Sequence, residues 1–307
     1  MTALTGMEGY EALRQSSAWF DVSARGRIKL TGEDRARLLH AMCTNNIHAL
    51  KPDEGCYAFF LNAQGRILCD AHILCRPDHF LVGTEPDTRA KLLDHLDRFI
   101  IADDVTLEDV TETTVCLAVE GPQAEAKLRE LGAPIPENPD CSEEWGPRLI
   151  YKITDERLRV ITFPGDSDLT ARLGEQAGTA AANVVRLERG IPRYGDDILE
   201  KHLVQETRQL QAVHFSKGCY IGQEIVERVR SRGQVHKGLA NVEIDGAEAI
   251  APEAEITDDQ GTKCGTLVSS AYSPALGKVV AMAYLRTDQL GPQAKPMSLN
   301  GAAVKLR

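Results

Sequence analysis

The expected strands and helices occur in the same order twice, and this recurrence constrains the fold more than any other feature of the chain. Each run consists of a strand, a helix, two strands and a further helix, over residues 27–99 and 115–176. Alternating polarity predicts the strands, and apolar residues at helical spacing predict the helices. The sequence therefore predicts a duplicated α+β unit with helices packed on antiparallel or mixed sheets.

The pattern changes in the last quarter of the chain. From Gly238 onward, short alternating segments are separated by turn-rich stretches at 258–261 and 273–277, which is typical of a small β-barrel or sandwich. A boundary is expected at residues 234–237. We therefore expect three domains: a first α+β subdomain at 1–110, a second at 111–235 and a barrel at 236–307.

Composition limits the class of protein. A chain of 307 residues can bury two or three cores, and its formal charge of −10 argues against a protein that coats nucleic acid. No apolar stretch approaches the roughly 18 residues of a membrane span, and no basic start precedes an apolar run, so we expect neither membrane insertion nor secretion. Eight cysteines without a C-x-x-C pair predict reduced thiols in the cytoplasm and no metal site.

Residues 217–224, Lys-Gly-Cys-Tyr-Ile-Gly-Gln-Glu, form the most distinctive motif. Two glycines flank Cys219, and a helical pattern begins just after them. A helix N-terminus and the nearby charge of Lys217 would both favour the thiolate, which makes Cys219 the candidate reactive cysteine and predicts that it is exposed to solvent. The alternative is a small buried side chain beside a tight turn.

The motif at 217–224 resembles the signature of the YgfZ-type folate-binding proteins, relatives of the glycine cleavage T-protein (aminomethyltransferase) that assist iron–sulfur proteins. Stretches elsewhere resemble the T-protein family in the same order: 20–23, 61–70, 186–188 with 194–198, and 273–278. The resemblance covers nearly the whole chain. It implies a folate-binding region of two swapped α+β subdomains followed by a β-barrel, arranged around a central hole.

Departures from the T-protein pattern favour the YgfZ-type branch. Cys69 replaces the first of two paired aspartates, an arginine that helps to bind folate falls at about Ala182, and Cys219 has no T-protein counterpart. The resemblance then implies a tetrahydrofolate-binding accessory protein that supports iron–sulfur cluster assembly or repair, and indirectly tRNA modification. Two alternatives stay open: an aminomethyltransferase or other one-carbon transferase, and a non-catalytic interaction scaffold. Whether the protein is an enzyme is therefore open too.

Asp70 and Tyr57 are candidate site residues on the expected hairpin. A carboxylate half-buried at the end of a mostly apolar strand would have a raised pKa and could exchange a proton with a folate nitrogen. The resemblance matches Asp70 to the aspartate that contacts the reacting nitrogen, and Tyr57 to a tyrosine against the folate. Alternatively, Asp70 binds backbone amides in a turn and Tyr57 belongs to the core. His72 would share the strand face of Asp70.

Other candidates follow from charge. Glu188 could accept hydrogen bonds from the amide and amine of a pterin, or pair with a neighbouring arginine. Lys217, Arg228 and Arg232 would suit the acidic glutamate tail of folate, or would be solvent-exposed with weak ion pairs. The predicted site thus comprises the following residues: Cys219 and Asp70 as catalytic groups, and Tyr57, Asp70, Glu188, Lys217, Arg228 and Arg232 as folate ligands.

Overall fold

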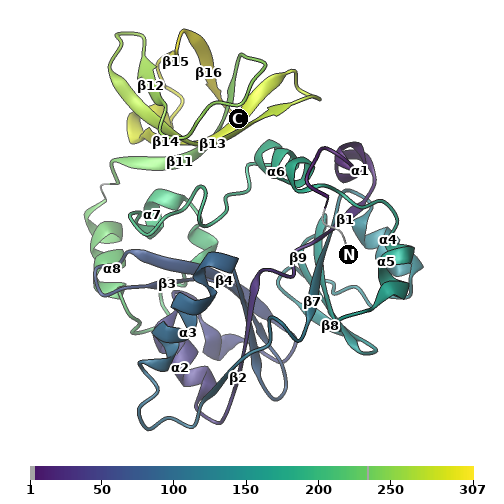
Figure 1. Ribbon diagram of the computed structural model, residues 1–307. Helices are drawn as coiled ribbons and strands as arrows, with labels where there is room; N and C mark the ends of the chain where they lie inside the picture. Colours follow the sequence, from purple (N-terminus) through teal and green to yellow (C-terminus); the bar gives the residue numbers. More distant parts are fainter. Residues whose placement is uncertain (1–3, 234) are drawn as a thin grey trace. The chain divides into compact units, whose positions relative to one another are not determined.

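The computed structural model describes residues 4–233 and 235–307 (Figure 1). It is a mixed α/β structure with a closed C-terminal β-barrel of six strands, which confirms the expected fold class. The described chain forms two compact units. The first comprises the residues up to Ala63, with Leu68–Ala182 and Gln211–Ile221. The second comprises Gln64–Ile67, Asn183–Leu210 and Gly222–Arg307.

Two helices, α2 (Arg35–Met42) and α3 (Arg89–Asp97), pack on one face of the first sheet. Its strand order is β3 (Gly55–Leu61), β4 (Ile67–Cys75), β5 (Phe80–Thr84), β2 (Gly26–Thr31) and β6 (Thr106–Asp109). Alternate residues such as Ile28, Phe60 and Ile73 are fully buried in a core that includes side chains of α2 and α3. Since strand side chains alternate, the intervening residues of β3 and β4 face the opposite side.

The second sheet begins with a strand from the start of the chain. Its order is β1 (Ala18–Asp21), β7 (Val115–Glu120), β10 (Arg157–Thr162), β9 (Arg148–Thr154) and β8 (Ser142–Trp145). β1 is antiparallel to β7, with Trp19 opposite Val119. Leu128 of α4 (Ala124–Glu130) and Leu169 of α5 (Ser167–Leu173) share its core. β1 thus precedes the whole first sheet in sequence but belongs to the second sheet, which is the expected swap.

The barrel lies in the second unit. Its strands run in the order β11 (Lys237–Ile244), β14 (Lys278–Arg286), β13 (Lys263–Ser273), β12 (Glu255–Asp258), β15 (Met297–Leu299) and β16 (Ala302–Leu306). The expected boundary at 234–237 includes Gln234, which lies outside the described residues. The remaining helices are α1 (Tyr10–Gln15), α6 (Thr179–Glu188), α7 (Val204–Thr207) and α8 (Gln223–Arg232), with single 3-10 turns at Ile47–Ala49, Pro86–Thr88, Leu210–Ala212 and Thr287–Gln289.

Two helix boundaries differ from the sequence prediction. A helix expected at 168–176 ends at Leu173, where Gly174 adopts a positive φ of 92°. The sequence from Asn183 to Arg189, which ends at Gly190 with Pro192 beyond it, also predicts a helix, and in the structure this helix already begins at Thr179. The alanines at 180–182 explain the earlier start, because alanine has the strongest intrinsic helix propensity. Among the residues that the structure describes, no helix is both long enough and apolar enough to cross a bilayer.

We predict that Gly121→Ala destabilises the swapped sheet. Gly121 has a φ of 128°, and an added Cβ would lie 2.4 Å from the Ser16 carbonyl oxygen, just before β1. The free energy of unfolding should fall by about 3 kcal/mol, from backbone strain and this contact together. The two tryptophans of the chain, Trp19 and Trp145, both lie in this sheet, so tryptophan fluorescence during urea unfolding measures the effect.

Gly132→Ala is the matched control. Gly132 also has a positive φ, 85°, but no atom lies within 4 Å of an added Cβ. It should therefore lose only the roughly 1 kcal/mol that a left-handed alanine costs. Equal losses in the two variants would show that the contact with the segment before β1 is unimportant.

Candidate functional site

A row of ionisable side chains crosses four neighbouring strands of the first sheet or their ends. The Tyr57 hydroxyl of β3 donates a hydrogen bond of 2.7 Å to Oδ2 of Asp70 in β4. Arg25, just before β2, forms an ion pair with Glu85, just after β5. Thr84 is the register partner of both Ala71 and Gly26. Asp70, Glu85 and Arg25 each occupy the next position beyond these pairs, so the register itself aligns them.

Asp70 is the buried carboxyl group of this row. Only 5% of its surface is exposed, and burial, followed by the negative charge of Glu85, raises its pKa to about 6. The charge of Arg25 and the Tyr57 hydroxyl act in the opposite direction. Burial and the charge of Asp70 raise the pKa of Tyr57 well above its usual range, so this hydroxyl keeps its proton and remains a donor. Asp70 can therefore change protonation near neutral pH.

One oxygen of Asp70 has no partner. Its Oδ1 is buried and accepts no hydrogen bond from any described residue. A buried polar atom without a partner costs roughly 1–3 kcal/mol, so its presence in a folded chain calls for an explanation. An acceptor in this state, on a carboxyl that can also hold a proton, suits an N–H or O–H group of a ligand.

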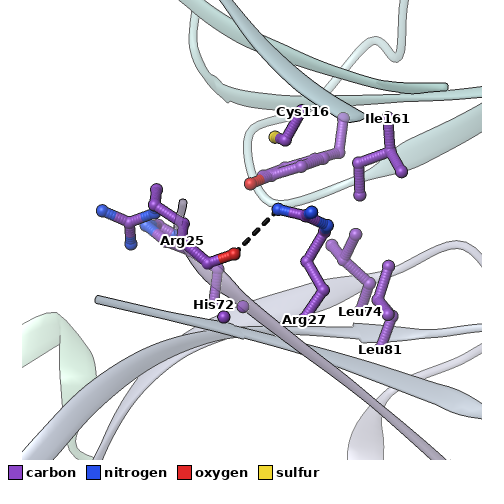
Figure 2. A pocket seen from close by; sticks show the side chains of 10 residues that line it. Arg25, Arg27, His72, Leu74, Leu81, Cys116 and Ile161 are labelled. Atoms are coloured by element: carbon purple, nitrogen blue, oxygen red, sulfur yellow. Dashed lines mark hydrogen bonds between the residues drawn. The ribbon is translucent and has the colours of Figure 1, made fainter. Parts of the chain in front are cut away.

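A small cavity lies beside this row (Figure 2). Its volume is about 10 Å³, which is room for about one water molecule and not for a ring system. Its lining includes Arg25, Arg27 and His72 of the first sheet and Cys116, Tyr151 and Ile161 of the second. The Arg27 guanidinium donates to the Arg25 carbonyl at 2.8 Å, the contact drawn in Figure 2, and thereby fixes the backbone at Arg25.

His72 follows Asp70 on the same face of β4, as expected. Its ring lies 5.1 Å from the Tyr57 ring, measured between centroids, and its Nδ1 lies 3.7 Å from an oxygen of Asp140. Burial lowers the pKa of His72, although Asp140 acts against this shift. His72 is therefore neutral at neutral pH, and adds a polar group to the face without adding charge.

Lys217 has a structural role. It is 9% exposed, and its Nζ donates to the carbonyl oxygens of His40 and, at 2.7 Å, of Cys43. These carbonyls belong to the C-terminal end of α2, where backbone acceptors lack partners within the helix. The His40 ring is in turn 3.0 Å from the Lys217 carbonyl oxygen. The ammonium group thus caps α2 and is not available for an acidic ligand tail; the motif gave no sign of this because its partner is 174 residues away.

Cys219 is exposed, whereas six of the other seven cysteines are buried and Cys141 is half-buried. Its expected position at a helix start is wrong. α8 begins at Gln223, and its N-cap is Gly222, with a left-handed φ of 85°. Cys219 lies in the loop before this cap, because the chain turns at Gly222 and not at Gly218 to enter the helix.

Three predicted ligands, Glu188, Arg228 and Arg232, belong to the second unit, whereas Asp70 and Tyr57 belong to the first. Oε1 of Glu188 accepts a hydrogen bond of 2.6 Å from the Ser273 hydroxyl of β13. Of the two neighbouring arginines considered as partners of Glu188, Arg186 and Arg189, the first pairs with the fully buried Asp197. Arg228 and Arg232 are both exposed on α8. Within the first unit, the structure therefore brings together Tyr57 and Asp70.

Arg25 and Glu85 are the residues that sequence reasoning missed. Glu85 directly follows the apolar strand 80–84, and Arg25 directly precedes the strand that begins at Gly26. A charged residue at the end of a strand, beside a strand that carries a candidate acid, was the available signal. Among the described residues, no group of three or more His, Cys, Asp or Glu side chains is arranged to hold a metal ion.

Two family descriptions match the chain. The GCVT N-terminal domain matches residues 5–138, and the glycine cleavage T-protein C-terminal barrel domain matches residues 237–298. The N-terminal match precedes the barrel match in the sequence, and the barrel match covers β11 to β14 and reaches into β15 of the six-stranded barrel. The chain therefore belongs to the glycine cleavage T-protein superfamily.

Individual relatives are more distant. An aminomethyltransferase from Rubrobacter xylanophilus is 29% identical over 298 residues, which cover 92% of this chain and 79% of the relative. A chloroplastic putative transferase from Arabidopsis thaliana is 26% identical over 277 residues, 85% of this chain but only 63% of the relative. The crystal structure of glycine cleavage system aminomethyltransferase T from Bartonella henselae has a TM-score of 0.88 and 20% identity, and covers 99% of this chain and 90% of that chain. This last likeness establishes the fold.

We predict that Asp70 makes stability depend on pH. Its pKa is raised from 3.8 to about 6 on folding, so the folded state holds the proton more tightly than the unfolded chain. The resulting stabilisation is present below about pH 4 and is lost as the pH rises through about 6, by at most about 3 kcal/mol. Asparagine at position 70 cannot titrate, so Asp70→Asn should not lose this stabilisation. The free energy of unfolding of Asp70→Asn minus that of wild type should therefore increase between pH 4 and pH 7.

Urea unfolding followed by circular dichroism at several pH values measures this difference. Asp259→Asn, at an exposed position on a barrel loop, should keep a constant difference from wild type across the range. A constant difference for Asp70→Asn as well, or one of opposite sign, would contradict the raised pKa.

Proposed function

We propose that the protein binds tetrahydrofolate or a derivative at the face that carries Tyr57 and Asp70. The observation that carries the proposal is the buried Oδ1 of Asp70, which has no partner among the described residues. A folate ring nitrogen that bears a hydrogen would satisfy it. The aminomethyltransferase names of the relatives point to the same class of ligand.

Asp70 and Tyr57 each have a role that fits such a ligand. Asp70, with its pKa near 6, would accept or return a proton at the folate nitrogen, and Tyr57 would fix the orientation of the carboxyl through Oδ2. Bound tetrahydrofolate would supply a nitrogen able to carry a one-carbon group. Glu188 stays a proposal for the pterin amide and amine, and Arg228 and Arg232 for the acidic tail. Lys217 is left out of this set because its ammonium group caps α2.

We predict that Asp70→Asn weakens tetrahydrofolate binding about tenfold, which corresponds to roughly 1.4 kcal/mol. The substitution keeps the volume of the side chain and an acceptor for Tyr57, but it removes the charge and the exchangeable carboxyl proton. Isothermal titration calorimetry with tetrahydrofolate at pH 7 measures the change, and Asp259→Asn serves as the control with unaltered affinity. If wild type itself shows no binding at millimolar folate, the protein is an interaction scaffold and this proposal fails.

We further propose that the folate-binding protein acts as a cytoplasmic accessory factor for iron–sulfur proteins, with Cys219 as its working thiol. The exposed position of Cys219 in the loop before α8 supports this role, because oxidants and partner proteins can reach an exposed thiol. The division into domains at 1–110, 111–235 and 236–307 belongs to the same proposal. It places the Cys219 motif at the end of the second subdomain.

We predict that deletion of the gene lowers the activity of cluster-dependent enzymes, such as those that thiomethylate tRNA, most strongly under oxidative stress. Re-expression of Cys219→Ala should restore little of this activity. Cys141→Ala is the matched control, since Cys141 is the only other cysteine that is not buried, and it should restore the activity fully. Equal restoration by both variants would remove Cys219 from the mechanism and leave folate chemistry at Asp70.

An aminomethyltransferase is the second candidate, favoured by the names of the relatives and by the proton-exchanging carboxyl of Asp70. A glycine cleavage assay with the lipoyl carrier protein separates the two. The accessory role requires that the purified protein is inactive in this assay and that glycine cleavage is normal in the deletion strain. Loss of glycine cleavage on deletion would assign the transferase activity instead.

A further inference from the structure

A second pocket lies entirely within the second unit, on the barrel. Its volume is about 280 Å³. Its walls come from the ends of β11, β13 and β14 and from the segment before α7. The charged and aromatic residues that line it are Lys201, His202, Lys237, Glu253, Lys263, Tyr284 and Arg286. None of these residues takes part in the folate proposal.

The pocket is strongly basic although the chain is acidic. Its lining contains four cationic side chains and one carboxylate, in a protein whose formal charge is −10. Such a reversal of sign in a concave site concentrates anions there.

Two of the cations are held close together by strand pairing. Lys237 of β11 lies directly opposite Arg286 of β14 in the antiparallel register, so both side chains project from the same face. Like charges at directly opposed positions destabilise a sheet. Lys237 also lies over the Tyr284 ring, with Nζ 5.1 Å from the centroid. An anion between Lys237 and Arg286 would contact both cations.

The buried His202 ring in the pocket lining is affected by the positive charges around it. Burial, followed by the charges of Lys237 and Lys201, lowers the pKa of His202 to about 3. The ring is therefore neutral. Its Nδ1 accepts a hydrogen bond of 3.0 Å from the Leu199 amide and lies 3.0 Å from the Tyr284 hydroxyl. Since Nδ1 is an acceptor, the proton of the neutral ring is on Nε2.

Carboxylates near the rim do not prevent anion binding. Glu253 lies 3.4 Å from the Lys201 ammonium, and Glu255 lies 2.7 Å from that of Lys263, but all four side chains are more than half exposed. Asp288 pairs with Arg286 at 2.7 Å and is likewise exposed. Asp258 is different: its side chain is only 4% exposed, it lies 4.0 Å from Arg286, and its other oxygen accepts hydrogen bonds from the amides of Gln260 and Thr262, so it stays in place when an anion binds. Exposed pairs of this kind contribute about 0–1 kcal/mol each, so a multivalent anion can displace them.

We propose that this barrel pocket binds a small polyanion, a ligand with two or more phosphate or carboxylate groups. Four cations around a pocket of this size suit such a ligand better than a single charge, since opposite walls can each engage one anionic group. The volume is below that of most pockets for drug-sized molecules, which favours a compact ligand.

Calorimetric titration of the full chain with pyrophosphate, and separately with citrate, tests the proposal and separates the two anion chemistries. At least one should bind saturably at one site, weaken as salt is added, and raise the melting temperature. Lys237→Gln and Arg286→Gln should each weaken the binding about tenfold. Lys305→Gln, which removes an exposed cation of the same barrel outside the pocket, should leave it unchanged.

Circular dichroism of each unliganded variant verifies that the barrel is intact, and the two pocket variants provide independent readings. Absence of saturable binding for both anions would overturn the proposal. An equal loss of affinity in Lys305→Gln would also overturn it, because this result would show general attraction to a charged surface.

Discussion

The burial of Asp70 beside a second carboxyl is the constraint on which the rest of the candidate site depends. A buried carboxylate is costly unless a counter-charge or hydrogen bonds compensate for the lost water. Here Arg25 is shared between two acids: it pairs with Glu85 directly and acts on Asp70 through its field. Because this compensation is partial, the pKa of Asp70 rises from 3.8 to about 6, close to neutral pH.

The alignment of these groups depends on strand register and not on local sequence. Side chains alternate between the faces of a strand, so a slip of one residue in β5 would move Glu85 to the face that packs on the helices. The apolar alternation of β5 prevents this slip, since Phe80 and Val82 must remain in the core. The hydrophobic core thus sets the electrostatics of the opposite face.

The same distinction explains how much the sequence could predict. The hairpin of β3 and β4 and the helix after Pro86 follow from local periodicity and turn residues, and the structure contains both. The Tyr57–Asp70 contact could be expected because one hairpin carries both residues. The partnership of Lys217 with α2 and that of Arg25 with Glu85 join segments far apart in the chain. The pattern of polar and apolar residues within one segment contains no information on which distant segment it will contact.

The place of β1 has a consequence for synthesis of the protein. Residues 18–21 emerge from the ribosome long before β7 at 115–120, the strand with which they pair. At translation rates of roughly 5–20 residues per second, the wait lasts about 5–20 s. Throughout that interval the strand that carries Ala18 and Trp19, both buried in the finished sheet, has no partner, while the first sheet can already close around β2. The nascent chain therefore presents β1 unpaired, with two side chains that are buried in the finished sheet, and such a strand is a natural substrate for chaperones that hold unpaired strands until their partner is made.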